Sequence, residues 1–148
     1  MLIEQNLIEL DLKAKNRDEA IEELSNMAFK AEKISSVEEF MNSVLEREKS
    51  YTTGVGNGIA IPHGKCDAVK EVTVVFGRSN CGIEWDSLDG KPVYLVFLLG
   101  IPTENAENTH LKILSQLSRK LMDENFVQTL KAASSKDEIL YVLNEISK

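Results

Sequence analysis

The stretch Tyr51–Cys66, Y-T-T-G-V-G-N-G-I-A-I-P-H-G-K-C, holds the arrangement of residues best suited to chemistry in this chain. It contains His63, one of only two histidines among the 148 residues, placed between Pro62 and Gly64. Proline fixes its own φ and favours an extended conformation for the residue before it, and glycine allows close approaches that a Cβ would block. An imidazole held at the end of a short apolar segment in this way is a candidate reactive group.

The chemistry that suits His63 is reversible phosphorylation. The reference pKa of histidine is about 6.5, so the neutral, nucleophilic ring is well populated near neutral pH. A transferring phosphoryl group spreads negative charge over its oxygens, and positioned donors therefore supply most of the catalysis. The candidate donors are the guanidinium of Arg47, the second imidazole of His110, the hydroxyl groups of Thr52 and Thr53, and the backbone N–H groups around Gly54.

Arg47 and His110 each have a second interpretation. Arg47 falls at the predicted end of a helix, where any cation is favoured, although its planar fork also suits a phosphate. His110 begins a predicted helix and shares an apolar face with Leu114 and Leu117, as a packed histidine would. It also follows the loop after the strongest predicted strand, and active groups collect at strand ends in open α/β sheets. Both interpretations stay open for both residues.

Composition argues against several classes of function. The formal net charge of −7 argues against nucleic-acid binding through a general basic surface. The longest apolar run, Val93–Leu99, is too short to span a bilayer and is typical of a buried strand, so we expect no insertion into the membrane. The first ten residues carry acids where a signal peptide would have lysines, so we expect a cytoplasmic protein.

The two cysteines, Cys66 and Cys81, predict neither a disulfide nor a metal site. Two thiols without an export signal are typical of a reducing compartment. His63 and Cys66 have H-x-x-C spacing, but a zinc site needs three or four ligands and the sequence offers no second cluster. Motifs for dinucleotides, a P-loop, a serine nucleophile elbow and an H-E-x-x-H zinc site are also missing. We therefore expect no metal and no cofactor.

The elements that must position these residues alternate between strands and helices. Strands are predicted at Leu2–Leu10, Gly58–Ile61, Val72–Phe76 and Val93–Leu99, with a loop over Arg78–Lys91. Helices are predicted to start at the capping residues Asn16, Ser36, Asp123 and Ser135, and another follows the loop Gly100–Asn108. Trp85 is expected to fold over the core. The sum is an α/β fold, a single domain in which a small mixed β-sheet is flanked by helices on its faces.

The segment from Arg47-Glu48 through Tyr51–Lys65 resembles the signature of the enzyme IIA components of the bacterial phosphotransferase system, fructose/mannitol family (EIIA type 2). The matching motifs are R-E-x-x-x-T-T-G-V-G-N-G-I-A-I-P-H-G-K, W-x-x-L-D-G-x-P-V-Y-L-V-F-L-L and T-H-L-K-I-L-S-Q-L. The resemblance covers essentially the whole chain, so residues 1–148 are expected to form one such domain. The second motif is closer to the fructose and nitrogen-regulatory branches than to the mannitol branch.

The resemblance implies specific roles and partners. His63 is expected to accept a phosphoryl group from phospho-HPr as a tele-phosphohistidine and to pass it to a cysteine of an enzyme IIB partner. It also implies that His110 and Arg47 lie beside the phosphohistidine. The sequence contains neither an enzyme IIB cysteine motif nor a permease segment, so we expect IIB on a separate chain and the permease IIC to be reached only indirectly.

Three functions fit these residues. The first is a phosphocarrier for uptake of a fructose-like sugar. The second is a regulatory, nitrogen-type IIA module whose phosphorylation state controls a target protein. The third is a metal-dependent hydrolase built on His63, His110 and a carboxylate. The motif itself serves the first two equally well.

Overall fold

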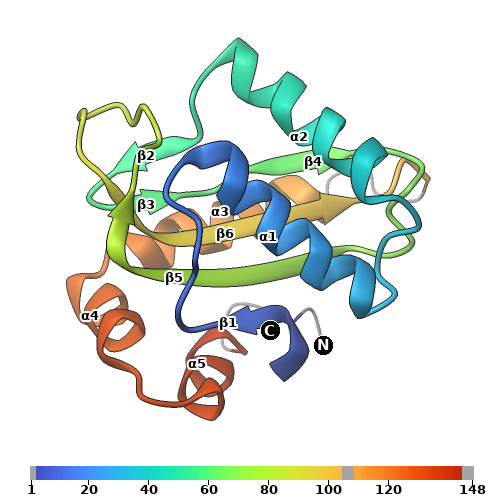
Figure 1. Cartoon of the computed structure of the whole chain (residues 1–148). Helices are drawn as coiled ribbons and strands as arrows, with labels where there is room; N and C mark the ends of the chain where they lie inside the picture. The colour runs from blue at the N-terminus through green and yellow to red at the C-terminus, as the bar shows by residue number, and fades with distance from the viewer. Residues whose placement is uncertain (1–2, 105–108, 145–148) are drawn as a thin grey trace.

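The computed structural model describes residues 3–104 and 109–144, except for the side chains of Thr109 and His110. A 3-10 turn, six strands and five helices follow one another along this part of the chain (Figure 1). In chain order they are η1 (Gln5–Leu7), β1 (Ile8–Glu9), α1 (Arg17–Lys30), α2 (Val37–Ser50), β2 (Gly54–Gly56), β3 (Ile59–Ala60), β4 (His63–Lys65), β5 (Thr73–Ile83), β6 (Val93–Ile101), α3 (Thr109–Leu121), α4 (Glu124–Ala132) and α5 (Lys136–Leu143).

Strand β6 lies at the centre of a mixed sheet with the order β1-β5-β6-β3-β2, and β4 also pairs with β6. On one side β6 runs antiparallel to β5. On the other side it runs parallel first to β3 and then to β4, which continue one another along the same edge. All residues of β6 except Tyr94 are buried. This confirms the prediction that the apolar run Val93–Leu99 is a central strand covered on both faces.

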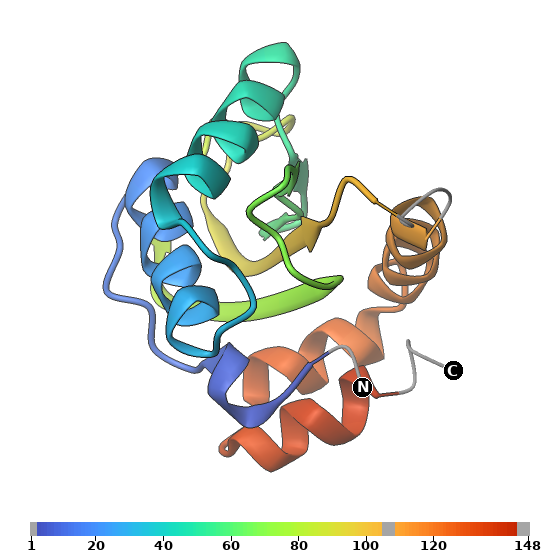
Figure 2. The ribbon, with the colours of Figure 1, turned by 90° about the vertical axis from the view of Figure 1, so that its right-hand side faces the viewer.

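The helices cover both faces of the sheet. Helices α1 and α2 lie together on one face, and α3 lies on the opposite face (Figures 1 and 2). Helix α5 packs against η1 and β1 near the edge strand. The predicted α/β fold with a small mixed sheet is confirmed.

Four helices begin where the sequence predicted, because a polar side chain accepts a hydrogen bond from a backbone N–H in the first turn. The acceptors are Asn16 for Glu19 N–H at 2.9 Å, Ser36 for Glu39 N–H at 3.1 Å, Asp123 for Asn125 N–H at 2.9 Å and Ser135 for Glu138 N–H at 3.3 Å. Three of the four follow the capping-box pattern, in which an acid stands three residues after the cap.

Two predictions of strands were wrong in extent. The predicted opening strand reduces to Ile8–Glu9, because only these two residues pair with β5 and Gln5–Leu7 form the 3-10 turn η1. Strand β5 continues to Ile83, through part of the predicted loop Arg78–Lys91. The polar run after Phe76 has no strand period. It pairs with β6 at both ends, Arg78 opposite Leu95 and Ile83 opposite Val93, with a register irregularity between them. The short strands β2 and β4 were not predicted.

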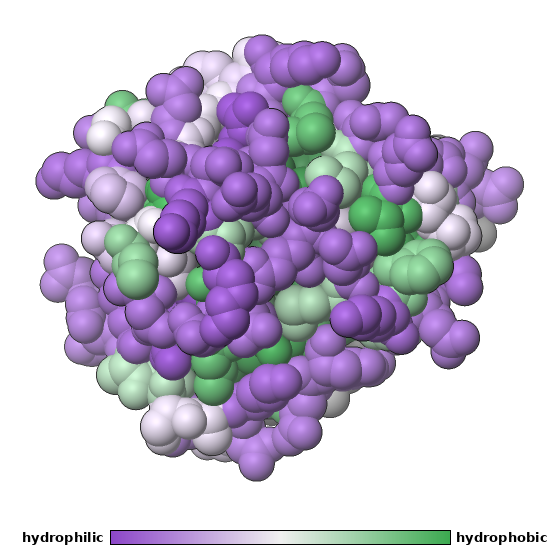
Figure 3. Space-filling model, in the orientation of Figure 1, coloured by the Kyte–Doolittle hydropathy of each residue, from purple (hydrophilic) through white to green (hydrophobic). Residues whose placement is uncertain are grey.

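The surface over α1 and α2 is mostly hydrophilic, with hydrophobic residues scattered between polar ones (Figure 3). Exposed large hydrophobic residues of the described chain include Phe29, Tyr51 and Met122. None of the helices in the described ranges combines the length and the apolar composition that a membrane span requires.

Arg78 of β5 ties the sheet to the C-terminal helices. Its Nη1 donates to the carbonyl oxygens of Leu130, Lys131 and Ala133 at 3.1, 3.2 and 2.6 Å, and its Nε donates to Leu10 at 3.2 Å. The last carbonyls of a helix lack partners within the helix, and a cation there also interacts well with the helix dipole. Arg78 therefore terminates α4 and holds it against β5.

We predict that Arg78→Ala lowers the free energy of unfolding by about 1–3 kcal/mol, because it leaves carbonyl groups without a charged donor. Arg119→Ala is the matched control, since Arg119 is exposed in the last turn of α3. Urea denaturation of the two variants measures the difference. Equal stabilities for both variants would contradict this role of Arg78.

Candidate functional site

His63 is the first residue of β4 and is only partly buried. It lies opposite Leu99 of β6, near the end of the central strand. Its ring Nδ1 is 3.1 Å from the carbonyl oxygen of Ile61. A carbonyl can only accept, so this bond places the ring hydrogen of neutral His63 on Nδ1 and the lone pair on Nε2. The ring is thus held in one orientation with a defined tautomer.

Helix α2 lies directly against β4 because residue 64 is glycine. A Cβ at Gly64 would lie 2.8 Å from Cγ2 of Val44 and 3.1 Å from the Val44 backbone nitrogen. The Ser43 hydroxyl donates to the carbonyl oxygen of Lys65 at 3.1 Å. The missing side chain therefore permits a helix–strand approach that any larger residue would prevent.

This packing sets the level of Arg47 along β4. Ser43 faces Lys65, and the chain that leaves α2 reaches Ile61, where Thr53 accepts a hydrogen bond from the Ile61 N–H. Helix α2 therefore runs antiparallel to β4. Arg47 follows Ser43 by about one helical turn, which rises about 5.4 Å, and His63 precedes Lys65 by two strand residues, which span about 6.6 Å. Arg47 therefore lies at about the level of His63.

The hydrogen bond that Arg47 donates fits its helix-terminus interpretation. Arg47 lies in the last turn of α2, and its Nη1 donates to the carbonyl oxygen of Tyr51 at 2.6 Å. A guanidinium has five N–H donors in a fixed fork, and this bond uses one of them. Closing the helix end and binding a phosphate are therefore compatible roles for the same side chain.

The groups of Thr52, Thr53 and Gly54 have partners inside the protein. The Gly54 N–H donates to the Thr52 hydroxyl oxygen at 3.1 Å. Thr53 is buried, and both its N–H and its hydroxyl donate to the carboxylate of Glu48, the N–H at 3.1 Å. Direct contact of these three residues with a phosphate stays a prediction. In this structure they hold the segment between α2 and β2.

Glu48 is the residue that sequence reasoning missed. It is 5% exposed, although it lies in the last turn of α2, where the helix dipole disfavours a negative charge. The signal was its spacing, since Phe40, Val44 and Glu48 follow at intervals of four and are the buried residues of this helix. A carboxylate in line with a core stripe indicates a specific buried partner.

The W-x-x-L-D-G motif, residues 85–90, packs against the glycine-rich hairpin formed by β2 and β3. A Cβ at Gly54 would lie 2.8 Å from Cδ1 of Trp85, and the Leu88 N–H donates to the Gly54 carbonyl oxygen at 2.9 Å. Asp89 accepts from the Asn57 N–H at 3.0 Å, and the N–H bonds to its carboxylate hold the pKa of Asp89 below its usual value. Trp85 is 2% exposed, which confirms the prediction that it folds over the core.

For the second histidine, His110, the structure describes the helix to which it belongs but not its side chain. His110 belongs to the first turn of α3, but its side chain lies outside the described residues. Helix α3 follows β6, and β6 pairs with β4 as far as Ile101, opposite Lys65. The proximity of His110 to His63 stays a prediction.

Cys66, close to His63 in sequence, is a poor nucleophile. It is partly buried, and this burial raises the pKa of its thiol above the ordinary value. The neutral thiol therefore prevails near neutral pH, and the thiolate is the reactive form. Across the described residues, no three His, Cys, Asp or Glu side chains gather as a set of metal ligands.

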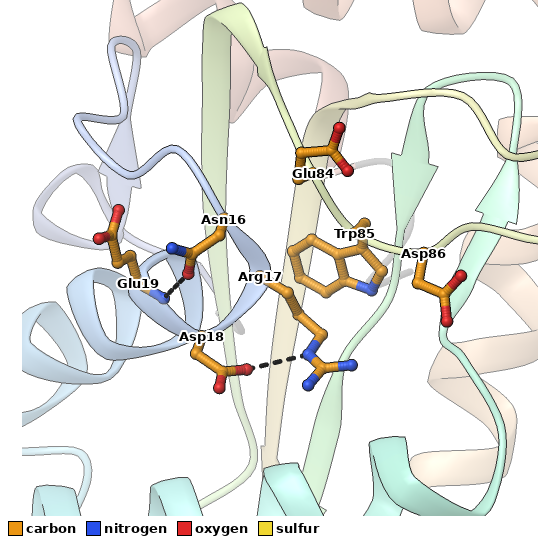
Figure 4. Close-up of a pocket in the computed structure, with 7 residues that line it drawn as sticks. All are labelled: Asn16, Arg17, Asp18, Glu19, Glu84, Trp85 and Asp86. Carbon is orange, nitrogen blue, oxygen red and sulfur yellow. Dashed lines mark hydrogen bonds and ion pairs between the residues drawn. The ribbon is translucent and has the colours of Figure 1, made fainter.

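A separate pocket lies at the start of α1, where that helix meets the chain after β5 (Figure 4). Its lining includes four carboxylates, and the guanidinium of Arg17 pairs with Asp18 at 2.9 Å. The Arg17 N–H donates to the Glu84 carbonyl at 2.9 Å, and the Glu84 N–H donates to the Lys15 carbonyl at 3.1 Å. These bonds fasten α1 to β5, and no predicted site residue lines this pocket.

Comparison with known proteins identifies the family to which this chain belongs. The sequence profile of the family described as "Phosphoenolpyruvate-dependent sugar phosphotransferase system, EIIA 2" matches residues 1–146. The chain belongs to this EIIA family. EIIA-type proteins are phosphotransfer components, so the resemblance seen in the His63 and Arg47 motifs is confirmed.

Sequence relatives of this EIIA protein include two fructose-specific components. It is 43% identical over 140 residues to the fructose-specific EIIA component of Haloferax volcanii, covering 95% of this chain and 90% of that protein. It is 39% identical over 147 residues to the fructose-specific EIIABC component of Bacillus subtilis, covering 99% of this chain but only 23% of that longer protein.

Solved structures share the fold over nearly the whole chain. The nitrogen regulatory protein IIA-Ntr from Neisseria meningitidis superposes with a TM-score of 0.89 at 34% identity, covering 96% of each chain. The enzyme IIA of the Escherichia coli mannitol system, solved in complex with phosphorylated enzyme IIB, superposes with a TM-score of 0.82 at 26% identity, covering 97% of each chain.

We predict that Gly64→Ala lowers the free energy of unfolding by about 1–3 kcal/mol, because the added methyl group overpacks the contact between α2 and β4. Gly100→Ala is the matched control. Gly100 pairs with Gly64 in the sheet, but its Cβ would meet only the side chains of Phe40 and Val69 at 3.4–3.5 Å. Urea denaturation should show a clear loss for the first variant and little for the second; the reverse order would contradict the packing argument.

Proposed function

We propose that this EIIA protein is a phosphocarrier for uptake of a fructose-like sugar, in which His63 accepts a phosphoryl group from phospho-HPr and donates it to a cysteine of a separate enzyme IIB. The observation that carries this proposal is the 3.1 Å contact between His63 Nδ1 and the Ile61 carbonyl oxygen. It supports Nε2 as the nucleophile, and hence a tele-phosphohistidine.

The proposed reaction is two in-line transfers. In the first, the lone pair of His63 Nε2 attacks the phosphorus of phospho-HPr; the new N–P bond forms as the bond to HPr breaks. In the second, a thiolate of enzyme IIB attacks the same phosphorus, and the electron pair returns to Nε2. The Nδ1–H donates to the Ile61 carbonyl oxygen throughout, and this hydrogen bond stabilises the positive charge on the phosphorylated ring.

Arg47 and His110 are proposed to bind the oxygens of the phosphoryl group. The level of Arg47 beside β4 supports this role, because a guanidinium fork matches two phosphate oxygens. His110 is assigned from the family resemblance. Among the threonines, Thr52 suits a direct contact best, since accepting from Gly54 leaves its hydroxyl hydrogen able to donate.

The fructose assignment rests on the 43% identity to the fructose-specific EIIA component of Haloferax volcanii. A regulatory function has its own support in the similarity to the Neisseria meningitidis IIA-Ntr. The sugar itself is expected to contact the permease and not this chain. The acceptor protein therefore distinguishes the two functions.

We predict that wild-type protein, mixed with phosphoenolpyruvate, enzyme I and HPr, takes up an acid-labile and base-stable phosphate, and that His63→Ala takes up none. Radiolabelled phosphoenolpyruvate measures the uptake. Cys66→Ser and Cys81→Ser are controls and should label normally, because thiols are not the proposed acceptor. Labelling that persists in His63→Ala would exclude this function.

We predict that Arg47→Ala lowers the rate of phosphoryl transfer from phospho-HPr about a hundredfold, by analogy with the loss of one oxyanion donor. Rapid-quench kinetics measures this rate. Lys49→Ala is the control, because Lys49 is an exposed cation of the same helix end, paired with Glu46. A rate unchanged in Arg47→Ala would remove Arg47 from the site.

Transport and regulation are separated by supplying a fructose-type enzyme IIB and its permease in vesicles. A transport component should drive phosphorylation of fructose in this assay. Phosphoprotein that forms normally but leaves IIB unlabelled would favour the regulatory module. Neighbouring genes give an independent check, since IIB and permease genes accompany transport and regulator genes accompany signalling.

A further inference from the structure

A chain of hydrogen bonds leads from a buried carboxylate to the imidazole of His63. Glu48 Oε2 accepts from the Thr53 N–H at 3.1 Å, and Glu48 Oε1 accepts from the Thr53 hydroxyl. The Thr53 carbonyl oxygen accepts from the Ile61 N–H at 3.0 Å. The Ile61 carbonyl oxygen in turn faces His63 Nδ1 at 3.1 Å.

The residues that form this series of hydrogen bonds are protected from water. Glu48, Thr53 and Ile61 are 5%, 4% and 5% exposed. A buried carboxylate with two good donors is strongly bound to them, because its alternative is an uncompensated charge in the protein interior. Glu48 therefore fixes the position of Thr53 more firmly than a neutral side chain would.

Thr53 needs such a fixed point because it stands in the irregular segment between α2 and β2. Its backbone carbonyl is the partner of the Ile61 N–H, and the peptide unit on the other side of Ile61 carries the acceptor for His63. A displacement of Thr53 would rotate Ile61 and with it the carbonyl that sets the ring orientation and the tautomer of His63.

We propose that Glu48 is a positioning residue for phosphoryl transfer: through Thr53 and Ile61 it holds the His63 imidazole in the Nδ1–H tautomer, with Nε2 aimed at the incoming phosphorus. The role in transfer rests on the proposed function, whereas the effect on the tautomer does not. Glu48 contacts neither phosphate nor imidazole in this arrangement and acts through its bonds to the N–H and the hydroxyl of Thr53.

Glu48→Gln and Glu48→Ala separate this role from simple loss of a buried group. A glutamine can accept from the Thr53 N–H with its carbonyl oxygen and donate to the Thr53 hydroxyl with its amide, so both contacts persist with one hydrogen reversed. Alanine removes both contacts. Glu46→Ala is the control on the same helix, because the Glu46 side chain is 71% exposed.

The first measurement is the tautomer of His63 in the unphosphorylated full chain, read from the ring ¹⁵N shifts above the ring pKa. With two histidines in the chain, His63→Ala assigns the signals. We expect the Nδ1–H form in wild type, Glu46→Ala and Glu48→Gln, and a mixture of both tautomers in Glu48→Ala.

The second measurement is the transfer rate from phospho-HPr. We expect Glu48→Ala to lower kcat about tenfold to a hundredfold with KM for phospho-HPr unchanged, as for a misplaced reacting group. Glu48→Gln should stay close to wild type. Arg78→Ala serves as a destabilised variant that takes no part in these hydrogen bonds, and its His63 tautomer and kcat should be those of wild type.

Thr53→Val and Thr53→Ser keep the proposal testable if Glu48→Ala does not fold. Valine keeps the shape but removes the hydroxyl and should shift tautomer and kcat in the direction expected for Glu48→Ala, whereas serine should not. The proposal is overturned if the tautomer of wild type persists in Glu48→Ala or Thr53→Val, or if Glu48→Gln is as impaired as Glu48→Ala. Should wild type accept no phosphate, the proposed function fails, and the tautomer series still decides the role of Glu48.

Discussion

The hydrogen bonding of β6 on both sides is the constraint on which the rest of the molecule depends. One edge of this buried strand pairs with the long strand β5, and the other edge receives first β3 and then β4. Because β3 and β4 continue along the same edge, the chain between them must pass Ile61 and Pro62 in extended form. His63 therefore emerges beside Leu99, near the end of the strand that anchors the sheet.

Close backbone packing turns this strand end into a site. Gly64 lets α2 approach β4, and Gly54 lets the Trp85 loop approach β2. In both places a side chain of a neighbouring element occupies the space that a Cβ would need. Gly54 and Gly64 thus serve to bring neighbouring elements close to the segment that carries His63.

The same arrangement explains how one fold serves different systems. The contacts that orient His63 are made by backbone groups of Ile61 and Thr53 and by a buried carboxylate, and none of them concerns a sugar. Related proteins named for fructose, mannitol and nitrogen regulation share the fold over nearly their whole length or over this domain. These contacts therefore do not distinguish one cargo or target from another.

Local signals in the sequence determined much of this protein. The caps at Asn16, Ser36, Asp123 and Ser135 fix helix starts because each acts within one turn, and the run Val93–Leu99 identifies the central strand because only a doubly covered strand is so apolar. The I-P-H-G core singled out His63 for the same reason, since its information lies in adjacent residues.

Tertiary structure alone decided the extent of β5, the pairing of β4 and the partners of Thr53 and Glu48. Strand β5 extends to Ile83 because Arg78 and Ile83 pair with β6, and Glu48 is buried because α2 lies on β4. The strand pairings depend on contacts between segments distant in sequence, and local propensity does not carry that information. The spacing of Phe40, Val44 and Glu48 indicates that Glu48 is buried, but it does not indicate that Thr53 is its partner.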